Sequence, residues 1–198
     1  AAAGDTIRNY FAKGEVFKKV DEMQPAVLIL SGGGNDILGD NMPNFLQDFL
    51  HDLQEGEKCE RFFNTAFSTE LDEISGLYRQ LFQHFKEKRP DMPILIHSYD
   101  YPRPRPTGSS PRHNWLGQYF DQKKITRGGD RSGAVKFMMD EFNARLKKVA
   151  EEFPGQVYYI DLRNTVLENQ WDDEIHPNNA GFQQVSGQFL RQIKALVG

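Results

Sequence analysis

Features that mark several large classes of protein are scarce or missing in this sequence of 198 residues. It contains a single cysteine, Cys59, which excludes a framework of intramolecular disulfide bonds. No apolar run approaches the roughly 18 residues that a membrane-spanning helix needs. Lys and Arg total 24 against 28 Asp and Glu, and this net charge of -4 disfavours a general nucleic-acid-binding protein. The composition is otherwise that of an ordinary soluble globular protein.

The sequence also shows no recognisable targeting segment. The N-terminal phrase AAAGDTIRNYF has neither a basic start nor a long apolar stretch, so no secretory signal peptide is visible. A mature secreted protein has the same appearance, so the compartment stays open. The length fits the prior of roughly 100–200 residues per domain, and we predict one domain over residues 1–198.

Three short, nearly continuous apolar runs predict β-strands. They cover residues 25–31, 93–98 and 156–161. Because the runs are continuous rather than alternating, we expect strands that are covered on both faces, as in a parallel sheet. A helix over residues 5–23, which Gly14 is placed to interrupt, leads into the first strand.

The segments between these runs have helical periodicity. Apolar residues at steps of three and four predict helices over 71–85, 135–149 and 182–196. Ser68 is the predicted N-cap of the helix over 71–85, and Pro177 marks the start of the last helix. Strands that alternate with helices predict an α/β protein, a three-layer α/β/α sandwich around a parallel sheet.

The segment 99–131 breaks this alternation, because it is rich in proline and glycine and too long for a plain connector. Long loops after the carboxyl end of a strand often form the wall or lid of an active site, which is the role we predict. A disordered insertion is the alternative. The segment contains more aromatic residues than disorder usually has: Tyr101, Trp115, Tyr119 and Phe120.

A glycine-rich phrase, LSGGGNDI over residues 30–37, follows the first predicted strand. In open α/β sheets ligands bind at this carboxyl edge, and glycines let the backbone approach a ligand closely. The side-chain amide of Asn35 is a neutral donor suited to a developing oxyanion. The alternative is a plain glycine-rich turn. The phrase has neither the Gly-Lys-Ser/Thr of a P-loop nor the spacing of a dinucleotide-binding fingerprint.

A second phrase, WDDEIHPNNAG over residues 171–181, lies between the third strand and the last helix. In a tight turn, the three-residue spacing of Asp173 and His176 brings a carboxylate to one imidazole nitrogen. Such a bond fixes the tautomer and raises the basicity of the other nitrogen. Two alternatives remain: a structural histidine, or a metal site in which Asp172, Glu174 or Asp36 joins this pair.

Gly4, in the phrase AAAGDT, precedes a predicted helix, so its backbone N–H can point at an anion. By itself this observation is weak. Ser31 and Ser98 end the first two predicted strands and are nucleophile candidates by position, but neither lies in a G-x-S-x-G phrase. We expect Gly4, Asn35, Asp173 and His176 to converge on one pocket at the carboxyl edge of the sheet.

Taken in order, the three phrases resemble the SGNH (GDSL-type) esterase/lipase superfamily. Gly33-Gly-Asn-Asp36 matches the family's Gly-x-Asn-Asp block, and Asp173-Glu-Ile-His176 matches its Asp-x-x-His block. The resemblance implies an ester hydrolase with a Ser-His-Asp triad, in which Asp173 and His176 are the acid and base. It implies that Gly4 and Asn35 donate to the oxyanion. It also implies a small-molecule ester substrate and no metal or organic cofactor.

One block of the family is missing, because no Gly-Asp-Ser occurs in the sequence. The resemblance implies a flavodoxin-like sheet of order 2-1-3-4-5, whose last three strands are those predicted here. We therefore expect the first two strands and the nucleophilic serine to lie upstream of Ala1, and this chain to be inactive alone. A non-catalytic binding module of the same fold and a metal-dependent phosphoesterase remain as alternatives. The substrate and the oligomeric state stay open.

Overall fold

The computed structural model describes residues 4–49, 51–109 and 114–197. Within them three parallel strands form one sheet in the order β1-β2-β3: Leu28–Ile29, Ile94–His97 and Val157–Ile160. Each strand lies inside a predicted run, and the parallel arrangement is confirmed. The strands are shorter than the runs that predicted them, although Leu30 and Ser98, just beyond β1 and β2, still donate their backbone N–H groups to Leu95 and Ile160 of the neighbouring strands, both at 2.9 Å.

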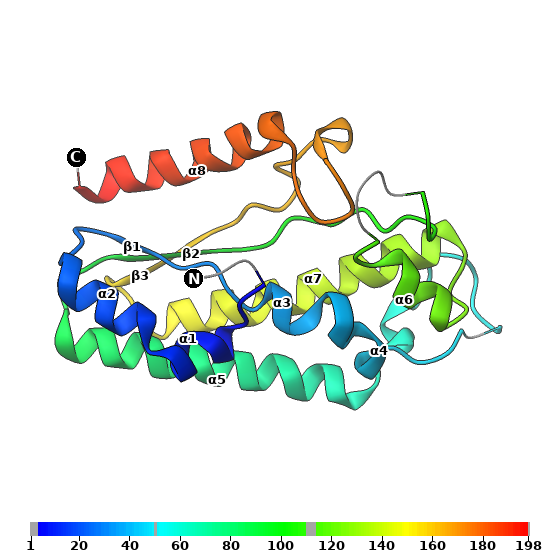
Figure 1. The fold of residues 1–198 in the computed structure, drawn as a ribbon, viewed down its shortest axis with the longest axis horizontal. Coiled ribbons are helices and arrows are strands. Elements are labelled where there is room, and N and C mark those ends of the chain that lie inside the picture. The colour runs from blue at the N-terminus through cyan, green and yellow to red at the C-terminus, as the bar shows by residue number, and fades with distance from the viewer. Residues whose placement is uncertain (1–3, 50, 110–113, 198) are drawn as a thin grey trace.

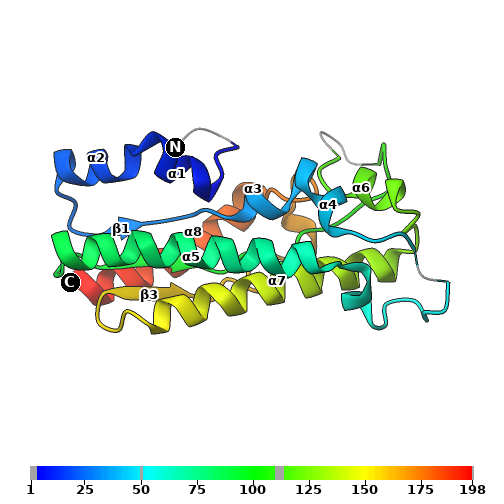
Figure 2. The same cartoon turned by 90° about the horizontal axis from the view of Figure 1, so that it is seen from below.

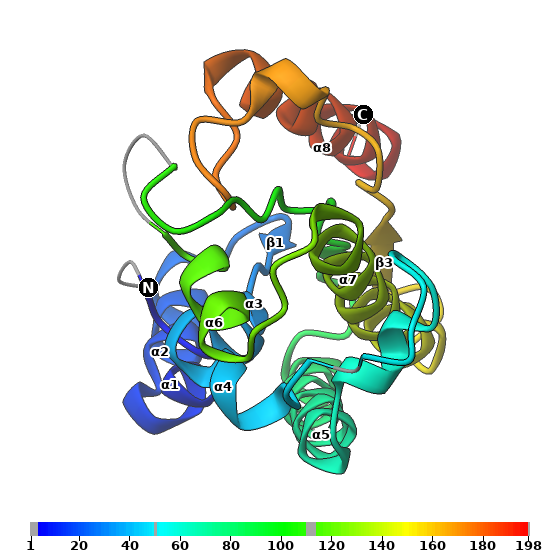
Figure 3. The same cartoon turned by 90° about the vertical axis from the view of Figure 1, so that its right-hand side faces the viewer.

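Helices lie on both sides of the sheet (Figure 1). α5 (Thr65–Lys88) and α7 (Gly128–Glu151) lie on one side, and α8 (Asn179–Val197) lies on the other. The end-on view in Figure 3 separates α8 from these two helices in the same way. The α/β class and the helices on both faces therefore agree with the prediction.

The two sides of the sheet bury apolar residues to different extents. The larger cluster includes Ile94 and Ile96 of β2 together with the apolar stripes of α5 and α7. The smaller cluster joins Leu95, Ile160 and Leu162 to one face of α8. Neighbouring residues of β2 thus pack into opposite clusters. This explains why Ile94, Leu95 and Ile96 are apolar without interruption.

The predicted helix over 5–23 is two helices. α1 (Ile7–Lys13) ends where α2 (Glu15–Met23) begins, at Gly14. Gly14 has φ 62°, a left-handed conformation that glycine adopts without steric strain, and it closes one helix while it opens the other. Figure 2 shows α1 and α2 on the β1 side of the molecule and α7 on the β3 side.

Two predicted helix boundaries are wrong. Asn64, rather than Ser68, caps α5, because its Oδ1 accepts the backbone N–H of Ala66 at 2.9 Å. α8 begins at Asn179 rather than at Pro177, which forms an isolated bridge with Trp171. In both cases an Asn side chain accepts the first free backbone N–H groups of the helix: Asn64 at α5 and Asn178 at α8. The periodicity of apolar residues does not locate such a cap.

Short elements fill the regions that periodicity left unassigned. After β1 and before α5 they are α3 (Gly34–Ile37), η1 (Gly39–Asn41), α4 (Met42–Phe45) and η2 (Cys59–Phe62). The segment 99–131 contains α6 (Gly117–Gln122), and its last four residues belong to α7. Residues 110–113 of that segment lie outside the described residues. The described part is therefore partly helical rather than a plain loop.

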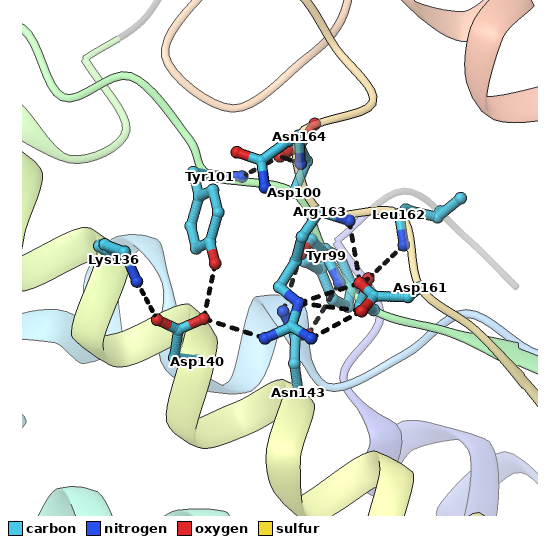
Figure 4. A network of polar contacts seen from close by, with 11 residues as sticks. Tyr99, Asp100, Tyr101, Lys136, Asp140, Asn143, Asp161, Leu162, Arg163 and Asn164 are labelled. Atoms are coloured by element: carbon cyan, nitrogen blue, oxygen red, sulfur yellow. Dashed lines mark hydrogen bonds and ion pairs between the residues drawn. The ribbon is translucent and has the colours of Figure 1, made fainter.

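A polar network fastens two loops to α7 beside the carboxyl ends of β2 and β3 (Figure 4). Oη of Tyr101 donates to Oδ1 of Asp140 at 2.6 Å, and Arg163 reaches the same oxygen at 3.3 Å. The Arg163 guanidinium also pairs with Asp161 and lowers the pKa of Asp161 to about 2. Burial, together with the hydrogen bond to Asp140, raises the pKa of Tyr101 to about 12. The network is therefore charged and intact at neutral pH.

The same network joins the two loops to each other. The Asp100 carboxylate accepts the backbone N–H groups of Asn164 and Val166, each at 2.7 Å. Asn143 of α7 exchanges two hydrogen bonds with the backbone of Tyr99, at 2.9 and 2.8 Å. These bonds fix the chain that leaves β2 and the chain that leaves β3 at one edge of the sheet.

Candidate active site

Asp173 and His176 form a hydrogen-bonded pair. Nδ1 of His176 lies 2.8 Å from Oδ2 of Asp173. The other carboxylate oxygen, Oδ1, accepts the backbone N–H groups of Ile175 and His176, each at 2.8 Å. This tight turn is what the three-residue spacing predicted, because the carboxylate folds back over the backbone that follows it.

The surroundings of Asp173 keep it charged. The residue is 3% exposed, and burial by itself raises the pKa of a carboxyl group. The hydrogen bonds from His176, from the two backbone N–H groups and from Trp115 outweigh burial, and the pKa of Asp173 lies below its usual value. A carboxylate is therefore present beside the imidazole at neutral pH.

The other side of the imidazole is open. The His176 side chain is 51% exposed, and Nε2 has no hydrogen-bond partner among the residues that the structure describes. When Nδ1–H donates to Asp173, Nε2 carries the lone pair. The pair can therefore accept a proton at Nε2 and stabilise the imidazolium that results.

Asn35 is placed by the turn that follows β1. Gly33 has φ 88°, and a Cβ there would lie 2.6 Å from a ring carbon of Phe142, so the turn needs glycine. Nδ2 of Asn35 donates to the backbone oxygen of Asp5 at 3.0 Å. One N–H of the amide is thereby used to hold the side chain, which leaves the second for a ligand.

Asp36 joins this turn to α1. Its Oδ2 accepts the backbone N–H of Ile7 at 2.8 Å, and its Oδ1 pairs with Arg8 at 3.0 Å. Burial raises the pKa of Asp36, although the Ile7 N–H and Arg8 act in the opposite direction. The bonds hold the start of α1, and with it Gly4, beside Asn35.

Three of the four predicted site residues, all but the buried Asp173, line two adjacent cavities rather than one pocket. Gly4 and Asn35 line a polar cavity of about 520 Å³. Asn35 and His176 line a second, more apolar cavity of about 330 Å³. Asn35 lies between the two because it belongs to the walls of both. Gly4 has φ 85°, and nothing lies within 4 Å of where its Cβ would be, so its backbone is accessible.

The two serine candidates are used in other ways. Ser98 is fully buried, and its Oγ accepts the backbone N–H of Leu162 at 2.6 Å and donates to Asp161 at 3.2 Å. Oγ of Ser31 lies 3.5 Å from Oη of Tyr99. Neither serine forms a hydrogen bond with His176, so this imidazole is not placed to activate either of them.

Two of the carboxylates considered for a metal site, those of Glu174 and Asp36, are hydrogen-bonded away from His176. Glu174 directs its carboxylate to the backbone N–H groups of Leu116 and Gly117, at 2.8 and 2.9 Å. Asp36 is engaged with α1, as described above. Within residues 4–49, 51–109 and 114–197 no three His, Cys, Asp or Glu side chains are grouped to hold a metal ion. The described residues therefore do not form the metal site that the sequence left open.

A family model supports the likeness that the motifs indicate. The model of the GDSL-like lipase/acylhydrolase family matches residues 1–184. The chain belongs to the GDSL-like lipase/acylhydrolase family. This is a family of enzymes that hydrolyse acyl esters, so membership implies ester hydrolase activity and an ester substrate.

Solved structures resemble this GDSL-like acylhydrolase at low sequence identity. A putative GDSL-like lipase from Parabacteroides merdae matches at 17% identity and a TM-score of 0.53, over 95% of this chain and 68% of that one. An extracellular lipase from Streptomyces rimosus matches at 12% identity and a TM-score of 0.49, over 95% of this chain and 78% of that one. The first likeness supports the fold. No curated protein matches the sequence.

The described part of this GDSL-like acylhydrolase contains no membrane-spanning helix. None of its helices there combines the length and the apolar character needed to cross a bilayer.

One side chain of the site was missed by sequence analysis. Nε1 of Trp115 donates to Oδ2 of Asp173 at 3.0 Å, across 58 positions of the sequence. The indole ring also meets the imidazole of His176 edge-on, with centroids 5.7 Å apart. Trp115 lies in the predicted wall segment 99–131, but no local pattern connects it with Asp173.

Proposed function

We propose that this GDSL-like acylhydrolase cleaves a small-molecule ester by a Ser-His-Asp mechanism, with His176 as the base and Asp173 as its acid partner. The hydrogen bond of 2.8 Å between Nδ1 of His176 and Oδ2 of Asp173 carries the proposal. It directs the lone pair of Nε2 to the exposed side of the ring, where a serine hydroxyl can approach it.

The proposed steps follow from these positions. A serine hydroxyl attacks the ester carbonyl while Nε2 of His176 takes its proton, and Asp173 stabilises the imidazolium. The imidazolium then donates this proton to the leaving alcohol, and water releases the acyl group by the same sequence. The free N–H of Asn35 and the backbone N–H of Gly4 are the proposed donors to the oxyanion. The mechanism requires no metal ion or organic cofactor.

The nucleophile of the proposal is a serine outside residues 1–198. The chain has no Gly-Asp-Ser phrase, and Ser98 is buried as a structural donor and acceptor. The free edge of β1 supports a continuation of the sheet, because in the described residues β1 pairs with β2 alone. Ile29 of β1 is 47% exposed, and a cavity of about 580 Å³ lies between β1 and α1–α2. Such an edge suits a further strand, as in a flavodoxin-like sheet.

Covalent labelling tests the proposal. The natural full-length protein is treated with a fluorophosphonate, digested and mapped by mass spectrometry. We expect one labelled serine outside residues 1–198, and labelling that is strongly slowed in His176→Ala. A label on Ser31 or Ser98 would overturn the assignment of the nucleophile.

Hydrolysis assays separate the remaining alternatives. We expect the full-length protein to hydrolyse p-nitrophenyl acetate at the same rate with and without a chelator. Loss of activity on chelation would indicate the metal-dependent phosphoesterase. Binding of esters without labelling or turnover would indicate the non-catalytic binding module.

A further inference from the structure

Trp115 completes the set of donors around the Asp173 carboxylate. Oδ2 of Asp173 accepts from Nδ1 of His176 at 2.8 Å and from Nε1 of Trp115 at 3.0 Å. Oδ1 accepts two backbone N–H groups from its own turn. Three of the four donors are therefore local to the turn, and only the indole comes from a distant part of the chain.

Glu174, the residue next to Asp173, holds the segment that carries the indole. It is fully buried, and its carboxylate accepts the backbone N–H groups of Arg105, Leu116 and Gly117 at 2.6, 2.8 and 2.9 Å. Because Leu116 directly follows Trp115, these bonds fix the backbone from which the indole projects. The turn that carries the acid thus also anchors its most distant donor.

Close packing at Gly117 shows how tightly this anchor is built. A Cβ at Gly117 would lie 1.6 Å from the backbone oxygen of Arg105 and 3.1 Å from Oε1 of Glu174. The same oxygen of Arg105 accepts Nη1 of Arg131 at 3.1 Å, and Arg131 is buried in α7. The segment is therefore joined both to the catalytic turn and to the helix behind it.

We propose that Trp115 is a positioning residue for the Asp173–His176 pair and that Glu174 is the anchor that holds Trp115 in place. The assignment rests on the proposed function for its effect on turnover. With the indole N–H on Oδ2, rotation of the carboxylate would break a bond on each oxygen, so one orientation toward Nδ1 is strongly favoured. The edge of the indole also limits the positions open to the His176 ring.

The first test is a spectroscopic one that needs no turnover. Trp115→Phe keeps an aromatic ring beside His176 and removes the N–H, and the carboxyl carbon of Asp173 is followed by ¹³C NMR against pH. We expect the pKa of Asp173 to rise, because a hydrogen bond to the charged form is lost. Trp171→Phe is the matched control for this titration, because Nε1 of Trp171 is buried and finds no hydrogen-bond partner among the described residues. An unchanged titration in Trp115→Phe would overturn the proposal.

The second test separates positioning from a merely structural role. In the full-length enzyme, Trp115→Phe is expected to lower kcat roughly tenfold with little change in KM. This is the effect expected from the loss of one hydrogen bond to the charged Asp173 carboxylate. Glu174→Gln is expected to move kcat and the Asp173 titration in the same directions. If Trp115→Phe lowers the melting temperature but leaves both kcat and the Asp173 titration of the folded protein unchanged, the proposal is overturned. A full-length enzyme without ester hydrolysis would overturn the proposed function, while the titration would still decide the placement of Trp115.

Discussion

The side-chain amide of Asn35 donates to the backbone oxygen of Asp5 at 3.0 Å, across 30 positions of the sequence. This bond joins two of the three motifs, because Asp5 follows Gly4 and Asn35 belongs to the glycine-rich turn after β1. It also orients the amide before any substrate arrives. A donor that is already fixed needs little reorganisation when negative charge develops on an ester oxygen.

Removing this donor gives the first prediction. In the full-length enzyme, Asn35→Ala is expected to lower kcat by about 10²–10³ with a smaller effect on KM, because the oxyanion exists only along the reaction path. Steady-state kinetics with a p-nitrophenyl ester measure both constants. Asn44→Ala, at an exposed residue of α4, is the control and is expected to keep the wild-type rate. An unchanged kcat in Asn35→Ala would remove Asn35 from the oxyanion hole.

The base is tested by comparing two histidines. His176→Ala is expected to lower kcat about 10⁴-fold or more, because no other group activates the serine. His51→Ala is the matched control, since His51 is exposed and its ring contacts Phe49. Equal activity of the two variants would contradict the role of His176, provided that circular dichroism shows both to be folded.

The glycine-rich turn gives a prediction about stability. Gly33→Ala is expected to lower the free energy of unfolding by about 1–3 kcal/mol or more, because the new Cβ meets Phe142 and φ is positive. Gly76→Ala is the control, since Gly76 lies within α5 with open space around its Cβ position. That change is expected to stabilise the protein by about 0.5–1 kcal/mol. Urea denaturation measures both, and a neutral Gly33→Ala would show that the turn adapts.

Acid dependence follows from the lowered pKa of Asp173. A carboxyl group whose pKa is lower in the folded state adds stability above its unfolded pKa of about 3.9, and this stability is lost as the pH falls through the folded pKa. Wild type is therefore expected to exceed Asp173→Asn in free energy of unfolding by about 1–3 kcal/mol at pH 7. Urea titrations at a series of pH values should show this difference shrink below about pH 4. A difference that is constant with pH would contradict the proposed charge on Asp173.

Local patterns in the sequence were sufficient for the strands, the main helices and the contact between Asp173 and His176. Continuous apolar runs predicted β1, β2 and β3, because buried parallel strands need apolar residues on both faces. The spacing of Asp173 and His176 predicted their contact, because an Asp side chain readily bonds to the turn that follows it. These features depend on residues that are close in the chain, so the sequence contains them directly.

Tertiary structure alone decided which distant groups complete the site. Trp115 reaches Asp173 across 58 positions of the sequence, and Asn35 reaches Asp5 across 30. Oγ of Ser98 accepts the backbone N–H of Leu162, in the chain that leaves β3. No periodicity or motif links such partners, because their contact depends on how α1, α6 and the sheet edge pack together. The sequence by itself determined which chemical groups are present near the carboxyl edge of the sheet. Packing decided which of them are held in place, because a side chain is oriented only when partners from other segments satisfy its donors and acceptors.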